Sequence, residues 1–190
     1  MNKLSLTCVA FSVAATSVAA NDYRPAMENF LSSSVQTWAE DDILLQAIRS
    51  QNAMTGGYDQ ARIDALDQAW RAEVGSTETP TITPVLNNAA SDFLRDQVAS
   101  SGGRITEVFV MDGHGLNVAA SDVTSDFWQG DESKFTETHG VGVGAVHYGD
   151  VEFDESSQTY QAQISMTITD PESGQPIGAI TIGVDAESLM

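Results

Sequence analysis

The chain has 190 residues, of which 27 are acidic and 8 are basic, and its formal net charge at pH 7 is −19. This length allows one domain with a substantial core. The negative charge repels nucleic acid and anionic lipid surfaces, so we expect no nucleic-acid partner and a solvated acidic surface suited to an exported or salt-tolerant protein.

The first part of the chain has the pattern of a secretory signal peptide. Lys3 precedes an apolar run of small residues, and the polarity changes abruptly after Ala20. We place cleavage after Ala20, with cleavage after Ala19 as the alternative, and expect the mature chain, 21–190, in the periplasm without stable insertion in the membrane. A retained membrane anchor is the other interpretation, although the run is short for a span of about 20 residues. The single cysteine, Cys8, lies in the removed segment, which leaves the mature form without disulfide or thiol chemistry.

Apolar residues at three- and four-residue steps predict helices in the first half of the mature chain. We expect one long amphipathic helix from Tyr23 to Gln51, with a break near Glu40, followed by a loop from Asn52 to Gly57. A second helix begins after a cap at Asp59. A third helix runs from about Val85 to Val98, after a linker rich in Gly, Ser, Thr and Pro.

Runs of β-branched and aromatic residues predict a five-stranded sheet in the second half of the chain. Short turns between successive strands make the pairing antiparallel. Apolar and polar residues alternate in the fourth strand, so one face packs on helices and the other is polar, either exposed to solvent or covered by a ligand cavity. The expected strands are Ile105 to Met111, Leu116 to Val123, Ala145 to Phe153, Thr159 to Thr169 and Ile177 to Val184.

The polar segment after the second strand is the candidate site. Thr124 or Ser125 can cap a short helix there, and Trp128 is surrounded in sequence by hydrogen-bonding side chains, a combination suited to small polar ligands. The acidic neighbours favour a cationic or hydroxyl-rich ligand over a carboxylate. The alternative is that Trp128 plugs the end of the core, as buried tryptophans usually do. The ligand-binding candidates are Asp122, Asp126, Trp128, Gln129 and Asp154.

The residues form no pattern that predicts catalysis or a cofactor. His114, His139 and His147 fall in a turn, a loop and a strand, and the sequence contains neither Gly-x-Ser-x-Gly nor His-Glu-x-x-His. We therefore expect a protein that is not an enzyme and that carries no cofactor and no catalytic metal. The carboxylates of 122–132 leave a Ca²⁺ site open, although their spacing matches no EF-hand loop.

The predicted order of elements resembles the Cache family of extracellular, PAS-like sensor domains. In that family several helices, the first of them long, precede a five-stranded antiparallel sheet with a helical excursion after the second strand. The resemblance is strongest at 108–118, 121–132 and 170–185, and it covers nearly all of the mature chain, which looks like a stand-alone periplasmic member. It implies an α+β fold, with a helical part at about 22–100 and a sheet part at about 104–190, and a small-molecule pocket between the sheet and the segment after strand two.

The resemblance also implies a partial set of ligand contacts. Amino-acid-sensing relatives place an Arg, any residue and then Trp-Tyr on the ligand's carboxylate side, and a later Asp on its amine side. Trp128 matches the Trp, but Asp126 stands where the Arg would be and Gln129 where the Tyr would be, which puts carboxylate recognition in doubt. Asp154 matches the amine-side Asp, and its place in a turn explains it equally well.

Three classes of function remain. The first is a periplasmic small-molecule-binding sensor module that passes ligand occupancy to a membrane receptor or kinase. The second is a ligand-independent accessory subunit of a membrane signalling complex. The third is an unrecognised hydrolase. We rank them in that order.

Overall fold

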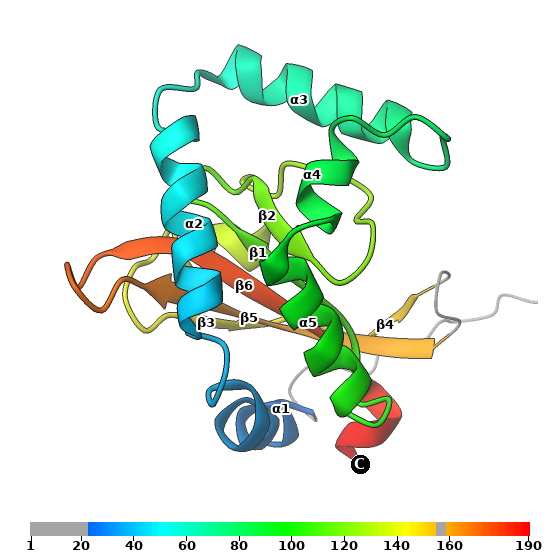
Figure 1. The fold of residues 1–190 in the computed structure, drawn as a ribbon. Helices are drawn as coiled ribbons and strands as arrows, with labels where there is room; N and C mark the ends of the chain where they lie inside the picture. Colours follow the sequence, from blue (N-terminus) through cyan, green and yellow to red (C-terminus); the bar gives the residue numbers. More distant parts are fainter. Residues whose placement is uncertain (1–22, 155–158) are drawn as a thin grey trace, which may run out of the picture.

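The computed structural model describes residues 23–154 and 159–190, so the predicted signal peptide and its cleavage site lie outside the described residues. Helices occupy the first half of the described chain and strands most of the second (Figure 1). Within the described residues, no helix combines the length and the apolar character needed to span a membrane. The elements are α1 (Arg24–Phe30), the π-helix η2 (Leu31–Val35), α2 (Asp42–Thr55), α3 (Gln60–Glu73), α4 (Ile82–Leu86), α5 (Ala89–Ser100), β1 (Ile105–Met111), β2 (Asn117–Ala120), α6 (Ser133–Thr136), β3 (Val146–Tyr148), β4 (Glu152–Asp154), β5 (Thr159–Thr169), β6 (Pro176–Asp185) and the 3₁₀ helix η3 (Ala186–Leu189).

The strands form one antiparallel sheet, which confirms the predicted α+β fold. The strand order is β2-β1-β6-β5-β3, and β4 pairs with β5 on the same side as β3. The sheet therefore has six strands instead of the expected five, because the expected third strand is divided. The peptide N–H of Gly149 still donates to the carbonyl of Gln163 (2.8 Å), after which the chain leaves the sheet until Glu152.

The predicted long N-terminal helix is divided into α1, η2 and α2. The division lies where we expected a break, since Asp41 has an extended backbone (ψ 143°) that no helix can include. Its carboxylate accepts a hydrogen bond from the peptide N–H of Ile43 (3.0 Å), which caps the start of α2. The helix then continues to Thr55, so the loop expected from Asn52 begins later than predicted.

An asparagine divides the predicted third helix in the same way. Asn88 has an extended backbone (φ −138°, ψ 165°), and its side chain accepts a hydrogen bond from the peptide N–H of Ser91 (2.9 Å). The single helix expected from Val85 to Val98 is therefore wrong, and α4 and α5 take its place. The predicted cap at Asp59 is confirmed, because its carboxylate accepts a hydrogen bond from the peptide N–H of Arg62 (2.9 Å).

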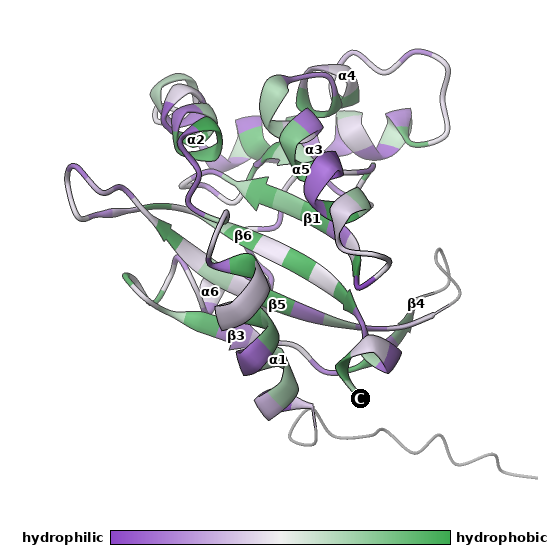
Figure 2. Cartoon of the chain, turned by 60° about the horizontal axis from the view of Figure 1, so that its bottom comes forward, coloured by the Kyte–Doolittle hydropathy of each residue, from purple (hydrophilic) through white to green (hydrophobic). Residues whose placement is uncertain are grey.

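The largest apolar cluster lies between the helices and one face of the sheet. Figures 1 and 2 show α2 and α5 lying across this face, and Figure 2 shows hydrophilic bands along β5. Because successive side chains of a strand point to opposite faces, the polar residues of β1 and β5 face away from α2 and α5. The buried strand residues of the cluster are Ile105, Val108, Val110, Val118, Ala119, Ala162, Ile164, Ile168, Ile180, Ile182 and Val184.

A buried carboxylate connects the predicted turn between β1 and β2 to the end of α2 by hydrogen bonds. Asp112 is fully buried, and its side chain accepts hydrogen bonds from the hydroxyl of Thr55 (2.8 Å) and the amide of Gln51 (3.1 Å). It also accepts from two peptide N–H groups of the turn itself, those of His114 (2.9 Å) and Leu116 (3.0 Å). Asp112 thus bonds both to α2 and to the turn, and its buried oxygens have the hydrogen-bond donors that buried polar groups need.

The segment after β2 packs against this turn as an irregular chain. Leu116 and Trp128 form an isolated β-bridge, and a Cβ at Gly115 would lie 2.5 Å from the Cα of Gly130, so the contact requires glycine. The predicted helix capped by Thr124 or Ser125 is wrong, because peptide groups of this segment bond to the turn and the first helix after it is α6.

Candidate functional site

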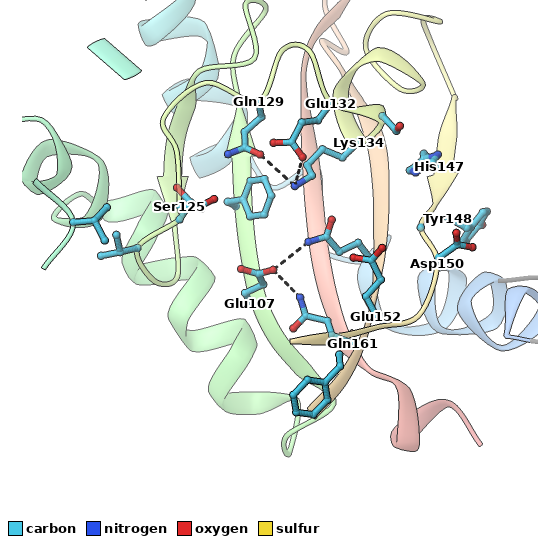
Figure 3. Close-up of a pocket in the computed structure, with 18 residues that line it drawn as sticks. Glu107, Ser125, Gln129, Glu132, Lys134, His147, Tyr148, Asp150, Glu152 and Gln161 are labelled. Carbon is cyan, nitrogen blue, oxygen red and sulfur yellow. Dashed lines mark hydrogen bonds and ion pairs between the residues drawn. The ribbon is translucent and has the colours of Figure 1, made fainter. Parts of the chain in front are cut away.

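A cavity of about 930 Å³ lies on the polar face of the sheet. Its floor comes from β1 and β5, one wall from 123–134, and the opposite wall from 147–153 (Figure 3). Val74, at the end of α3, completes the rim. Gln161 and Gln163, on the polar face of the expected fourth strand, therefore line a cavity. A cavity was one of the two alternatives for that face.

A carboxylate with fixed neighbours forms the centre of the floor. The amide of Gln161 donates to Oε1 of Glu107 (2.8 Å), and the amide of Gln163 donates to the same oxygen (3.3 Å). The hydroxyl of Thr106 donates to Oε1 of Gln161 (2.6 Å), which fixes the orientation of the Gln161 amide. Figure 3 shows the two amides converging on Glu107.

A glycine in the central strand makes room for this network. In the sheet register Gly183 of β6 lies opposite Glu107 on one side and opposite Gln163 on the other. A Cβ at Gly183 would lie 2.7 Å from Cγ of Glu107 and 2.8 Å from Nε2 of Gln161. The missing side chain therefore lets long polar side chains meet across β6.

An ammonium group lies on the wall above the floor. Nζ of Lys134 lies 5.4 Å from the ring centroid of Phe109, within the range of cation–π contacts. The same ammonium pairs with Oε2 of Glu132 (3.0 Å) and donates to Oε1 of Gln129 (3.3 Å). Its side chain is only 17% exposed, so these contacts hold the charge in place.

The wall formed by 147–153 carries further ionisable groups. Nδ1 of His147 lies 2.9 Å from Oε2 of Glu137, the residue that follows α6. Burial raises the pKa of the Tyr148 phenol, over whose ring the guanidinium of Arg24 lies at 4.9 Å. Asp150 and Glu152 add two carboxylates to the lining.

Helix α3 holds the wall formed by 123–134. The carboxylate of Asp67 accepts hydrogen bonds from the peptide N–H groups of Phe127 (2.9 Å) and Trp128 (3.0 Å). The indole N–H of Trp70 donates to the carbonyl of Thr124 (2.8 Å), and its ring stacks on Phe127 with centroids 5.3 Å apart. These bonds connect α3 to the backbone of a segment that has no regular structure of its own.

Of the five candidates named from the sequence, the structure brings Gln129 to the cavity. Its side chain is 2% exposed and joins Lys134 to the carbonyl of Asp126. Asp126 itself pairs with the guanidinium of Arg71 (2.9 Å) and does not line the cavity. Asp122 is exposed and also does not line it.

Trp128 points away from the cavity lining. Its indole N–H donates to the carbonyl of His114 (2.9 Å), and its ring packs on a second apolar cluster that includes Ile63 and Trp70. This is the placement expected from the packing alternative. Asp154 is the last residue of β4, opposite Thr159, and its side chain lies outside the description, so its contact with a ligand stays a prediction.

Two of the carboxylates considered for Ca²⁺ have basic partners. Asp126 pairs with Arg71, and Glu132 pairs with Lys134. Among residues 23–154 and 159–190, no group of three or more His, Cys, Asp or Glu side chains is placed to hold a metal ion.

Sequence reasoning missed two charged groups that line the cavity, Glu107 and Lys134. Glu107 is the one acidic residue within an otherwise apolar and β-branched strand, and this isolation was a usable signal. Lys134 is one of only 8 basic residues in a chain of net charge −19, which was a second signal. The polar row containing Gln161 and Gln163 was recognised, but the register that brings it to Glu107 was not.

Comparisons with known proteins find similar solved structures at low sequence identity. No family model matches the sequence, and no curated protein matches it either.

Similar solved structures include the sensor domain of the V. cholerae histidine kinase DctB, with 14% identity over 90% of this chain and 57% of that one, and a TM-score of 0.45. Another is the sensory domain of the Campylobacter jejuni chemoreceptor Tlp3, with 13% identity over 88% of this chain and 65% of that one, and a TM-score of 0.43. An extracellular ligand-binding receptor from Desulfohalobium retbaense has 15% identity over 80% of this chain and 26% of that one, with a TM-score of 0.39. The chain spans less than two thirds of the length of each. These similar structures are sensor and ligand-binding domains.

Proposed function

We propose that the chain is an exported, periplasmic small-molecule-binding sensor module, and that its ligand occupies the cavity over Glu107. The observation that carries the proposal is the fixed hydrogen-bonding floor formed by Glu107, Gln161 and Thr106. Groups held in place before a ligand arrives lose little entropy on binding, so such a floor suits recognition.

The size and lining of the cavity support binding of a small molecule. Its volume of about 930 Å³ lies within the roughly 300–1,000 Å³ of typical ligand sites. Its surface combines the aromatic rings of Phe109, Tyr148 and Phe153 with polar groups that come from different strands. This combination fixes the orientation of a ligand as well as holding it.

We further propose that occupancy reaches a membrane receptor or kinase partner through the end of the domain that contains α1 and η3. The two elements lie side by side there (Figure 1). The cavity residue Tyr148 contacts α1 directly, through the guanidinium of Arg24. A ligand that moves the wall containing Tyr148 would therefore also move α1.

The test is a ligand-library thermal-shift screen on the exported protein. A compound at 100 times its dissociation constant stabilises the native state by about 2.7 kcal/mol. For a chain of this size that corresponds to roughly 5–10 °C in melting temperature. Compounds that raise the melting temperature are then tested on Gly183→Ala, which fills the floor, and on Gly57→Ala, where a Cβ meets nothing within 4 Å.

Stabilisation that is lost in Gly183→Ala and kept in Gly57→Ala supports binding in the cavity. Stabilisation that survives in both variants places the ligand elsewhere. If no compound stabilises the protein, the accessory-subunit alternative replaces the sensor module. Turnover of a screened ester or phosphate that is lost on replacing His147 would favour the hydrolase instead.

A further inference from the structure

We propose that the cavity selects an organic cation with an apolar body, such as a protonated alkylamine, whose ammonium group donates a hydrogen bond to Glu107. This inference rests on the proposed function and adds to it the chemical class of the ligand. Three features of the lining carry it: the arrangement around Glu107, the pairing of Lys134, and the apolar residues on the rim.

The floor fixes the Glu107 carboxylate but leaves one of its oxygens without a protein donor. Both glutamine amides donate to Oε1, at 2.8 and 3.3 Å. No side chain or peptide group among the described residues donates to Oε2. A carboxylate oxygen in a fixed position is a strong acceptor for a charged N–H group, because such hydrogen bonds are shorter and stronger than neutral ones.

The single lysine of the lining is not free to attract an anion. Lys134 pairs with Glu132 at 3.0 Å and donates to Gln129 at 3.3 Å. Glu132 already offsets the charge of this ammonium, and an anionic ligand that reached its remaining N–H would also approach the carboxylates of Glu107, Asp150 and Glu152. Like charges in a partly desolvated site repel, so the lining as a whole disfavours anions.

The rim adds apolar surface to this acidic interior. Val74, Val123 and Phe153 all line the cavity, and they are 47%, 40% and 49% exposed. These three side chains border the same cavity, so a ligand that enters it can contact apolar surface at the rim. A ligand with a charged head on the floor and an apolar body toward the rim would cover part of this surface.

The probes that test the proposal are butylamine, hexylamine, hexanoate and hexanol, titrated into the full chain by isothermal titration calorimetry. The two amines are protonated at pH 7, as lysine is. We expect hexylamine to bind more tightly than hexanol and hexanoate to show no binding. Hexylamine has two more methylene groups than butylamine, and each should tighten binding about two- to fourfold, as expected for partial burial of the group.

Two variants separate recognition by Glu107 from a general effect of net charge. Glu107→Gln keeps the size of the side chain and should weaken hexylamine binding about tenfold. Glu187→Gln removes the same charge from the exposed η3 and should leave the affinity within twofold. If Glu107→Gln does not fold, Glu107→Asp replaces it, because it keeps the net charge but draws the carboxylate back by one methylene group and should still weaken hexylamine binding.

The outcomes distinguish this inference from the proposed function. Equal binding of hexanol and hexylamine, binding of hexanoate, or full affinity in Glu107→Gln each overturns recognition of a cation by this carboxylate. If the amines fail to bind but library compounds bind and lose their effect in Gly183→Ala, the sensor module stands and the cation inference falls. If neither the amines nor any library compound binds, both proposals fall.

Discussion

Removal of the Asp67 carboxylate should loosen the cavity wall and destabilise the fold. Asp67 is 8% exposed, and one of its oxygens accepts the peptide N–H groups of both Phe127 and Trp128. Its other oxygen accepts from the guanidinium of Arg71 at 2.7 Å. The residue thus joins α3 to the segment that carries Gln129 into the cavity.

The structure predicts different costs for two substitutions at this position. Asp67→Ala leaves two peptide N–H groups without an acceptor, at about 1–3 kcal/mol each, so we expect a loss of about 3 kcal/mol in the free energy of unfolding. Asp67→Asn keeps an oxygen for both N–H groups and loses mainly the pair with Arg71. Because the Arg71 side chain is 55% exposed, that pair is screened by solvent, and Asp67→Asn should cost much less than Asp67→Ala.

Urea denaturation gives these free energies directly, and the slope of the transition shows whether the native state has changed. For a chain of this size, Asp67→Ala should also lower the melting temperature by roughly 6–12 °C. Asp64→Ala is the matched control, because Asp64 lies on the same helix and is exposed, and among the described residues its side chain bonds only to Gln60 (2.7 Å). If Asp67→Ala costs no more than Asp64→Ala, the carboxylate does not hold the segment and the account of the wall is refuted.

Local patterns in the sequence predicted the elements that depend on neighbouring residues. The cap at Asp59 and the turn at 112–115 were predicted because each uses side chains a few residues apart. The alternation in β5 predicted the buried row that contains Ala162, Ile164 and Ile168. The breaks at Asp41 and Asn88 have the same local origin, since each caps the helix that follows it. Only the first was anticipated, because apolar spacing continues across Asn88.

The candidate site could not be predicted in the same way, because its contacts depend on strand register. Glu107 meets Gln161 and Gln163 across 54 and 56 residues of sequence, and only because β6 lies between their strands with a glycine at position 183. No local sequence pattern predicts that Gly183 lies between the side chain of Glu107 and those of the two glutamines. The family resemblance led to Trp128, whereas the candidate residue that lines the cavity is Gln129, from the same segment.

Three further predictions concern the floor, the response to acid, and the tryptophan. Gly183→Ala should weaken binding of any cavity ligand at least tenfold, because the new methyl group displaces the floor side chains, while Gly57→Ala leaves titrations unchanged. The hydrogen bond from Arg49 lowers the pKa of Asp170 to about 2, below its ordinary 3.8, so the stability that this carboxylate contributes is complete above pH about 4 and is lost as the pH falls toward 2. Arg49→Gln should reduce that loss in acid denaturation, and an identical pH profile would contradict the assignment. Trp128→Phe should lower the free energy of unfolding by about 1–2 kcal/mol, because it removes a partly buried hydrogen bond and part of a packed ring. Ligand affinity should stay within twofold, since the indole does not line the cavity. A tenfold loss of affinity with little change in stability would instead place the ligand against Trp128, and the site over Glu107 would then be the wrong one.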